Sequence, residues 1–81
     1  MERRIGGILI LVNDKEQVTQ LNQILTNHSS IIIGRQGIPL REKMLSIISL
    51  VVEGTTDEIG SLTGQLGRLK GVKVKSVMAK G

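Results

Sequence analysis

The fold is decided by ILILVNDKEQVTQLNQIL (residues 8–25) and IISLVVEGTTDEIGSLTGQL (residues 47–66), two stretches that share one pattern. In each, an apolar run is followed by polar residues that can cap a helix, and then by leucine and isoleucine at helical spacing. A buried strand that leads into a capped amphipathic helix, found twice, predicts a βαβ–βαβ sandwich. We therefore expect an α+β, ferredoxin-like βαββαβ fold, with a four-stranded antiparallel sheet and two helices on one of its faces.

The composition limits both the size and the chemistry of the protein. The chain has 81 residues, enough for one domain over 1–81, and it contains neither cysteine nor any aromatic residue. Disulfides and thiolate metal sites are therefore excluded. The core has to be built from isoleucine, leucine and valine, which bury less area than aromatic side chains do. Association between subunits is the obvious compensation. The net charge of +4 allows a weak contact with polyanions but does not require one.

Four strands are predicted from the apolar and β-branched runs. They are expected at about 5–12, at 31–33 with Gln36 as the furthest extension, at about 44–53 and at about 72–78. Residues 34–43 carry two glycines, Pro39 and several charges, and we interpret them as the connection between the second and third strands.

Two helices are predicted between these strands. The first is expected to begin with Asn13 as its N-cap and to end near Asn27. The second begins with the T-x-x-E capping box of Thr55 and Glu58, and Gly71 is expected to stop it. Its apolar face consists of Ile59, Leu62, Leu66 and Leu69.

Glycines inside the second helix need an explanation, because each costs about 1 kcal/mol relative to alanine. They are Gly60, Gly64 and Gly67. We interpret them as positions of close backbone approach to the sheet or to a neighbouring helix. The alternative is a locally weak helix that tertiary packing holds in place.

The first and third strands are apolar on both faces, whereas the fourth alternates Val72 and Val74 with Lys73 and Lys75. The first and third strands should therefore be the central pair and the fourth an edge. Two helices cover only one face of such a sheet, so we expect another copy of the chain to cover the other face. The alternative is a sheet that leaves some isoleucine and leucine exposed.

Catalytic groups are sparse in the sequence. His28 is the only histidine, and a protonated imidazole near the end of the first helix would favour the helix dipole. Asp57 and Glu58 are adjacent and favour a helix start rather than acid–base chemistry. Neither the serine pair 29–30 nor Ser46 has a base nearby, so we predict no nucleophile constellation, no metal site and no cofactor.

The most distinctive local stretch is GRQGIPLR (residues 34–41). Glycines together with arginines can form turns that bind anions. The alternative is a hairpin connection with solvated charges. The spacing is not that of a P-loop, and no aromatic residue is available to stack on a base, so direct DNA binding by this chain alone is not expected.

From 8 to 77 the chain resembles ACT-like regulatory domains, and most closely the small iron-only hydrogenase system regulators. The matching segments are IGRQGIP (33–39), IISLVVEGTTDEI (47–59) and LGRLKGVKVK (66–75). The C-terminal domain of the nickel-responsive repressor is also similar, but its metal ligands are not matched here beyond His28. Its ribbon-helix-helix DNA-binding segment is not matched either. The small regulatory subunit of acetolactate synthase is similar as well, but the glycine usual in the first strand–helix turn is missing.

The resemblance implies an effector site at a subunit boundary. Carried onto this sequence, the site consists of Asn13, Asp14, Lys15, Gly34, Arg35, Gly37 and Arg41. An anionic group could be bound there by helix N–H groups and by an arginine in bidentate fashion.

The function implied is that of a non-enzymatic regulatory module, a transcriptional regulator of an iron-only hydrogenase system that acts as a homo-oligomer, dimer or tetramer. The alternative is a small-molecule-binding ACT-type subunit that controls a metabolic enzyme. A small-molecule or anionic effector and a protein partner are the expected ligands. No targeting signal or membrane-spanning segment is evident, so we expect a cytoplasmic protein with no membrane association.

Overall fold

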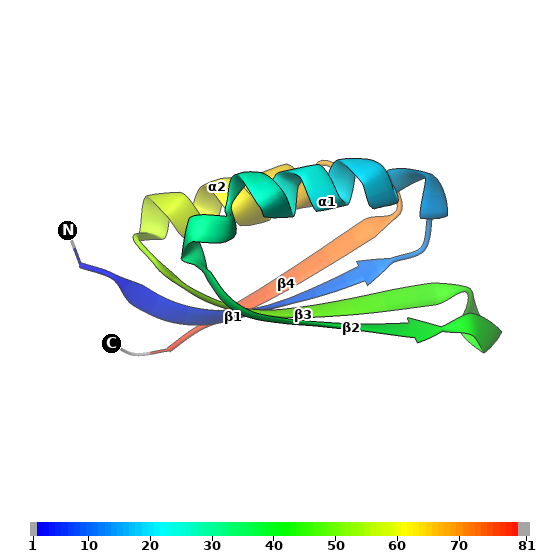
Figure 1. Ribbon diagram of the computed structural model, residues 1–81, viewed down its shortest axis with the longest axis horizontal. Helices are drawn as coiled ribbons and strands as arrows, with labels where there is room; N and C mark the ends of the chain where they lie inside the picture. Colours follow the sequence, from blue (N-terminus) through cyan, green and yellow to red (C-terminus); the bar gives the residue numbers. More distant parts are fainter. Residues whose placement is uncertain (1, 80–81) are drawn as a thin grey trace.

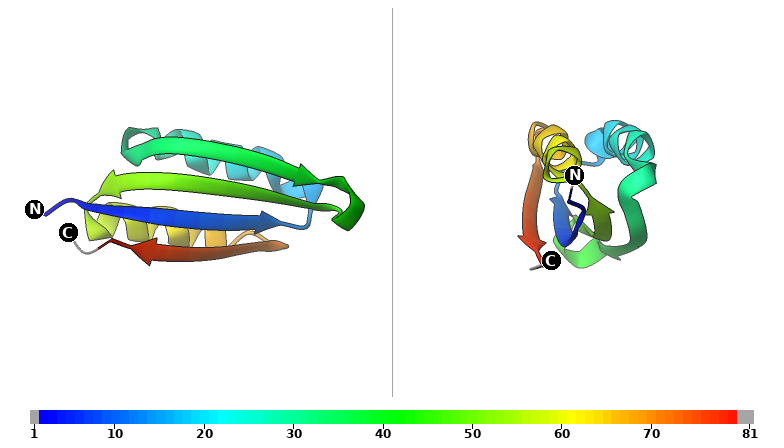
Figure 2. Two further views of the ribbon diagram at one scale, coloured as in Figure 1. Left: turned by 90° about the horizontal axis from the view of Figure 1, so that it is seen from below. Right: turned by 90° about the vertical axis from the view of Figure 1, so that its left-hand side faces the viewer.

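A four-stranded antiparallel sheet and two helices form two layers in the computed structural model, which describes residues 2–79. The strands are β1 (Arg4–Val12), β2 (Ile32–Leu40), β3 (Leu45–Gly54) and β4 (Val72–Met78), and the helices are α1 (Val18–Asn27) and α2 (Thr56–Gly67). The strand order is β2-β3-β1-β4, so β1 and β3 are the central pair and β4 is an edge, as predicted. Both helices lie on the same face of the sheet (Figures 1 and 2). The predicted ferredoxin-like fold is confirmed.

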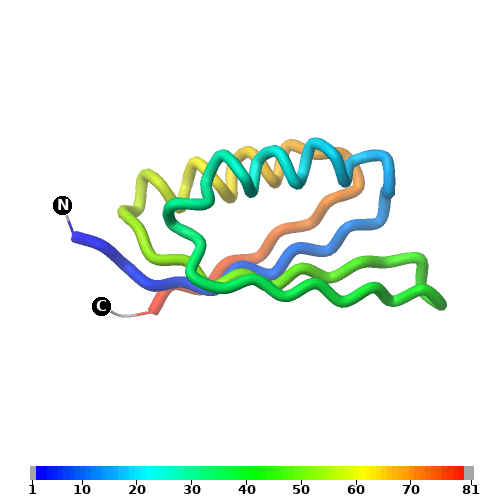
Figure 3. Tube along the Cα trace, viewed as in Figure 1, coloured from blue at the N-terminus to red at the C-terminus, as the bar shows by residue number. Residues whose placement is uncertain are grey.

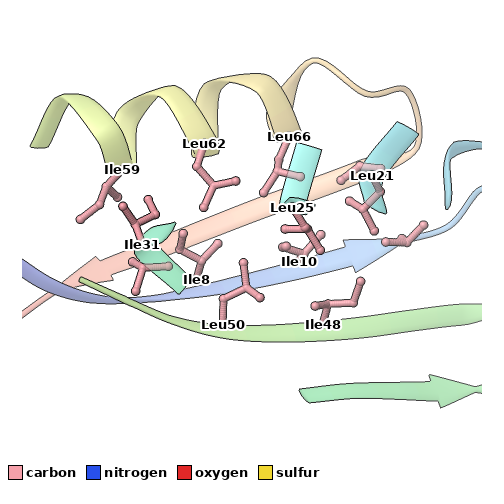
Figure 4. Packing of buried hydrophobic residues seen from close by; sticks show 13 residues of the cluster. Ile8, Ile10, Leu21, Leu25, Ile31, Ile48, Leu50, Ile59, Leu62 and Leu66 are labelled. Carbon is pink, nitrogen blue, oxygen red and sulfur yellow. The ribbon is translucent and has the colours of Figure 1, made fainter. Parts of the chain in front are cut away.

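The core lies between the helices and the sheet and is entirely aliphatic (Figure 4). Alternate residues of the central strands point into it, because side chains of a strand alternate between its faces. The strands contribute Ile8, Ile10, Val12, Ile48, Leu50, Val52 and Val72, and the helices and the turn before β2 contribute Leu21, Leu25, Ile31, Ile59, Leu62 and Leu66. Among residues 2–79 no polar or charged residue is buried.

The predicted capping box at the start of α2 is confirmed. The Thr55 backbone N–H donates to Glu58 Oε1 at 2.8 Å, and the Glu58 backbone N–H donates to Thr55 Oγ1 at 3.2 Å. The predicted cap of the first helix is wrong by one residue. Asp14, not Asn13, caps a short 3₁₀ turn, η1 (Lys15–Gln17), which precedes α1. Asn13 instead connects the end of β1 to the turn before β4, because its backbone N–H donates to the carbonyl of Gly71 at 2.8 Å.

Residues 34–43 are not a connection, contrary to the prediction. Most of this stretch continues β2 as far as Leu40, and only a 3₁₀ turn, η3 (Arg41–Lys43), together with Met44 joins β2 to β3. The strand tolerates Pro39 because it lies at the edge of the sheet, where a missing N–H breaks no ladder. The register shifts between Ile32 and Gly34, because Ile33 has no partner on β3 while Gly34 pairs with Val51. The resulting β2–β3 hairpin extends past the helices (Figure 3).

The glycines of α2 do not mark close packing within the chain. A Cβ atom added to Gly60, Gly64 or Gly67 would meet nothing within 4 Å among the described residues. The expected helix stop at Gly71 is also misplaced, because α2 already ends at Gly67. Gly71 instead has a φ of +75° in the turn before β4, where an added Cβ would lie 2.9 Å from the Cβ of Asp14. Glycine is needed there for both reasons.

Candidate functional site

A groove lies between the start of α1 and the overhanging part of the β2–β3 hairpin. It consists of two adjoining hollows of about 430 and 250 Å³, which share Val12, Val18, Pro39 and Ser46 in their walls. The groove exists because the hairpin is longer than the helix layer above it, so the helix-facing side of its outer part has no cover within residues 2–79 (Figures 1 and 3). Its volume suits a small molecule rather than a macromolecule.

Three cationic side chains reach this groove. Lys15 and Arg41 line the larger hollow, and Arg35 lines the smaller one. The guanidinium of Arg35 is positioned by α1, because Arg35 Nη2 donates to Asn22 Oδ1 at 3.0 Å. The shared walls are mostly apolar and the polar groups at the rim are positive. This arrangement suits a small anion that also carries an apolar part.

The structure brings together four of the seven site residues predicted from the sequence. Lys15, Arg35, Gly37 and Arg41 line the groove. The remaining three do not line it, namely Asn13, Asp14 and Gly34. The carboxylate of Asp14 accepts the backbone N–H of Glu16 at 2.9 Å, which occupies a donor that the sequence analysis had offered to an anion.

The pairing of His28 with Ser61 could not be predicted from the sequence. His28 Nδ1–H donates to the carbonyl of Ile24 at 2.7 Å, and His28 Nε2 lies within hydrogen-bond distance of Ser61 Oγ, at 3.3 Å. The pair links the end of α1 to α2 beside a hollow of about 340 Å³ that Asp57 also lines. The two residues lie far apart in the sequence, and no motif connects them.

The pair is part of a wider set of hydrogen bonds on the helix surface. Ser61 Oγ also accepts a hydrogen bond from Gln65 Nε2 at 3.0 Å, so it is one member of a helix-surface network. Within residues 2–79 no group of three or more histidine or acidic side chains is placed to hold a metal ion. His28 therefore has the role of connecting the two helices in this structure.

The capping carboxylate of α2 is the clearest electrostatic feature. The pKa of Glu58 lies below its ordinary value, chiefly because the backbone N–H of Thr55 donates to the carboxylate, and further because of the Thr55 side chain. Arg3 adds a smaller contribution, with Nη1 3.7 Å from Glu58 Oε1. These contacts attach the segment before β1 to the start of α2.

The second surface of interest is the sheet face opposite the helices, which we call the open face. It carries aliphatic side chains on both central strands, and no element within the described chain covers it (Figure 2, left). Ile5 is 49% exposed, Leu9 44% and Val51 45%, and Val77 of β4 is 75% exposed. None of the described helices is long and apolar enough to cross a membrane.

Comparison with known proteins identifies relatives of the whole chain. Residues 4–76 match the family model described as "TM1266-like: Iron-only hydrogenase system regulator, putative". The uncharacterized protein TM1266 from Thermotoga maritima has a similar structure, with 40% sequence identity and a TM-score of 0.94 over 98% of this chain and 100% of that chain. Among curated proteins, none matches the sequence significantly.

More distant structures share the fold alone. The C-terminal domain of the MgtC protein from Mycobacterium tuberculosis aligns with a TM-score of 0.71 and 13% identity, over 94% of this chain and 87% of that one. The nitrogen regulatory PII-like protein CPII from Thiomonas intermedia K12, determined with ADP, AMP and bicarbonate, aligns with a TM-score of 0.53 and 11% identity, over 99% and 96% of the two chains.

Proposed function

Since the chain belongs to the family of TM1266-like iron-only hydrogenase system regulators, we propose that it is a non-enzymatic regulatory module of such a system. In this proposal residues 1–81 form one ACT-like domain that acts as a homo-oligomer. Its output is a change in transcription of the hydrogenase system, and it works in the cytoplasm, where transcription takes place.

The observation that carries the proposal is the apolar open face. Both central strands present large aliphatic side chains to solvent there, at a cost of about 25 cal/mol for each Å² of apolar surface left in water. Contiguous apolar patches of this kind mark interaction surfaces in soluble proteins. A protein with a large apolar surface that suits contact with another protein fits a regulator better than an enzyme.

The proposed regulator reaches its target through a protein partner rather than by contacting DNA. The chain has no aromatic side chain to stack on a base, and its basic residues are spread over several elements. A ligand-dependent change in the oligomer could be transmitted to such a partner through the same surfaces.

Complementation of a deletion strain tests this function. The wild-type gene should restore the normal transcript level of the hydrogenase genes. The variant Val51→Lys, which places a charge in the open face, should not restore it. The matched control is Gln20→Lys, which adds the same charge at an exposed position on α1 and should behave like the wild type. Restoration by Val51→Lys, or a deletion that leaves transcription unchanged, would contradict the proposal.

The second candidate function is effector binding in the groove between α1 and the hairpin. The cationic Lys15, Arg35 and Arg41 around apolar walls favour a small carboxylate or phosphate compound. Thermal-shift screening of amino acids, nucleotides and simple anions should find a compound that raises the melting temperature. The shift should shrink in Arg35→Ala and in Arg41→Ala. It should persist in Arg68→Ala, because Arg68 is an exposed arginine at the end of α2 that does not line the groove. A shift that survives both groove variants would exclude this site.

A further inference from the structure

Two neighbouring glycines in the central strand β1 differ in the space around the position of an added Cβ. Gly6 points into the helix-covered layer, where an added Cβ would lie 2.9 Å from Met78 Sδ and 3.2 Å from the carbonyl of Val77. Gly7 points to the open face, where the nearest atom to an added Cβ is the carbonyl of Leu50 at 4.0 Å. Glycine weakens the interior of a strand, and it often marks a place where another backbone or a ligand approaches closely. The described chain supplies no such neighbour for Gly7.

Exposed apolar side chains surround Gly7 on all four sides. Ile5 and Leu9 precede and follow it on the same face of β1, Val51 is its partner on β3, and Val77 is its partner on β4. All four are among the exposed large hydrophobic residues of the chain. The centre of the open face is therefore a shallow dip with an aliphatic rim, where the backbone of a second sheet can approach closely.

Opposite charges lie on either side of this dip. Glu53 pairs with Ile5, and Lys75 pairs with Leu9, so Gly7 lies midway between Glu53 and Lys75 on the sheet. Both charged residues are exposed on the open face. Neither takes part in an ion pair within residues 2–79, where the one salt bridge joins Arg3 to Glu58.

We propose that two copies of this chain pack open face to open face about a twofold axis that passes by Gly7. A single rotation then places Glu53 of each copy opposite Lys75 of the other. The inference rests on the proposed oligomeric regulator, and it specifies the partner as a second copy and fixes how the two copies are oriented.

The same rotation also matches the apolar rim. With Glu53 opposite Lys75, the axis is oblique to the strands, so Ile5 comes to lie over Val77 of the second copy and Leu9 over Val51 of the second copy. The strands of the two sheets then cross at a steep angle, as in orthogonal sheet packing. An apolar centre with a charged rim is the usual anatomy of a stable interface.

The crossed arrangement limits the area that the two copies can share. The sheet is four strands wide, about 19 Å at the usual strand spacing, so two faces whose strands cross steeply overlap over about 370 Å² each in projection. The two faces together then fall below the roughly 1,000 Å² of a stable specific interface, which predicts a weak dimer whose population depends on the protein concentration.

Charge reversal measured by sedimentation equilibrium tests the proposed orientation. The full-length chain is studied at low salt, because exposed ion pairs are screened. Glu53→Lys and Lys75→Glu should each weaken the dimer about tenfold, since each places like charges opposite one another twice. The double variant Glu53→Lys/Lys75→Glu should return to within about threefold of the wild type, because the pairs are restored with opposite polarity. Lys73→Glu, two residues away from Lys75 on the same face of β4, is the matched control and should have a smaller effect than Lys75→Glu.

A second variant tests the dip at Gly7. Gly7→Val should leave the monomer as stable as before or make it more stable, because the site has room within the chain and valine favours strands. It should weaken the dimer about tenfold or more, because two added side chains would meet at the axis. If neither the charge reversals nor Gly7→Val changes the dimer affinity, the proposed orientation is wrong, but the proposal of an oligomeric regulator is not affected. A wild-type chain that stays monomeric at high micromolar concentration overturns the oligomer as well.

Discussion

Both faces of β1 carry aliphatic side chains, but their environments are opposite. Ile8, Ile10 and Val12 face the helices and are buried, whereas Ile5 and Leu9 face away and are about half exposed. The pattern of the strand is that of one buried on both sides, but the described chain covers only one side. The chain's own helices provide one cover, and in the proposed dimer a second copy provides the other.

The sharpest test of this difference compares neighbouring residues on opposite faces. Ile10→Ala removes a side chain with 0% exposure from the core and should destabilise the monomer by about 2–5 kcal/mol. Leu9→Ala removes a side chain that is 44% exposed and should cost the dilute monomer less than about 1 kcal/mol. Urea unfolding at low protein concentration measures both values.

The concentration dependence of the same measurement separates the two faces further. Leu9→Ala should lose more stability at high concentration than at low concentration, because the wild type gains from association and the variant gains less. Equal costs for Leu9→Ala and Ile10→Ala in the dilute monomer would show that the two faces do not differ as described.

Glycines give a second, smaller contrast between the faces. An alanine Cβ at Gly54, on the covered side, would lie 3.0 Å from Ile31 Cγ2 and 3.2 Å from Glu58 Oε1. Gly54→Ala should therefore destabilise the chain by about 1–3 kcal/mol through overpacking. Gly7→Ala on the open face meets no such neighbour and should leave the unfolding free energy of the dilute monomer unchanged or raised. Denaturant titrations of the two variants measure both unfolding free energies and show whether only the covered face is too crowded for an added methyl group.

Most of the fold could be predicted because its signals are local. The capping box of Thr55 and the alternation in β4 are each contained within a few residues. The extent of β2 could not be predicted, because Gly34, Gly37 and Pro39 give strong local turn signals. Their pairing with β3 depends on the position of β2 at the sheet edge, which only the whole topology determines.

The residues of the candidate site show the same limit of local patterns. Arg35, Gly37 and Arg41 belong to one local glycine–arginine pattern, and all three line the groove. Asn13 and Asp14 do not line it, and their backbone and side-chain groups bond to Gly71 and to the η1 turn, which the sequence alone does not indicate. The link between His28 and Ser61 joins two helices, and no pattern in either helix announces it.

The attachment of α2 to the covered face can be weakened through its cap. Thr55→Ala removes one half of the capping box and should cost about 1 kcal/mol in unfolding free energy.

The interaction between Glu58 and Thr55 is also pH-dependent. Because the folded-state pKa of Glu58 is lowered, its stabilisation is complete above the ordinary carboxyl value of 4.5 and is lost as the pH falls through the lowered value. Glu58→Gln should remove this part of the acid sensitivity, and urea titrations between neutral and acidic pH measure it. An unchanged acid response in that variant would assign it to other carboxylates.

The smallest expected effect concerns the outer surface of α2, which is a rival to the open face as an interface. Gly64 lies on that surface with no neighbour near its Cβ position among the described residues, so Gly64→Leu should raise the unfolding free energy by up to about 0.8 kcal/mol through helix propensity. This is the reverse of what close packing at Gly64 would give. The dimer affinity should not change, because the second copy packs on the opposite layer. A loss of affinity in Gly64→Leu, with the monomer stabilised as expected, would move the interface from the sheet to the glycines of α2. An unchanged affinity, together with a weakened dimer in Gly7→Val, would leave the open face as the surface that the second copy covers.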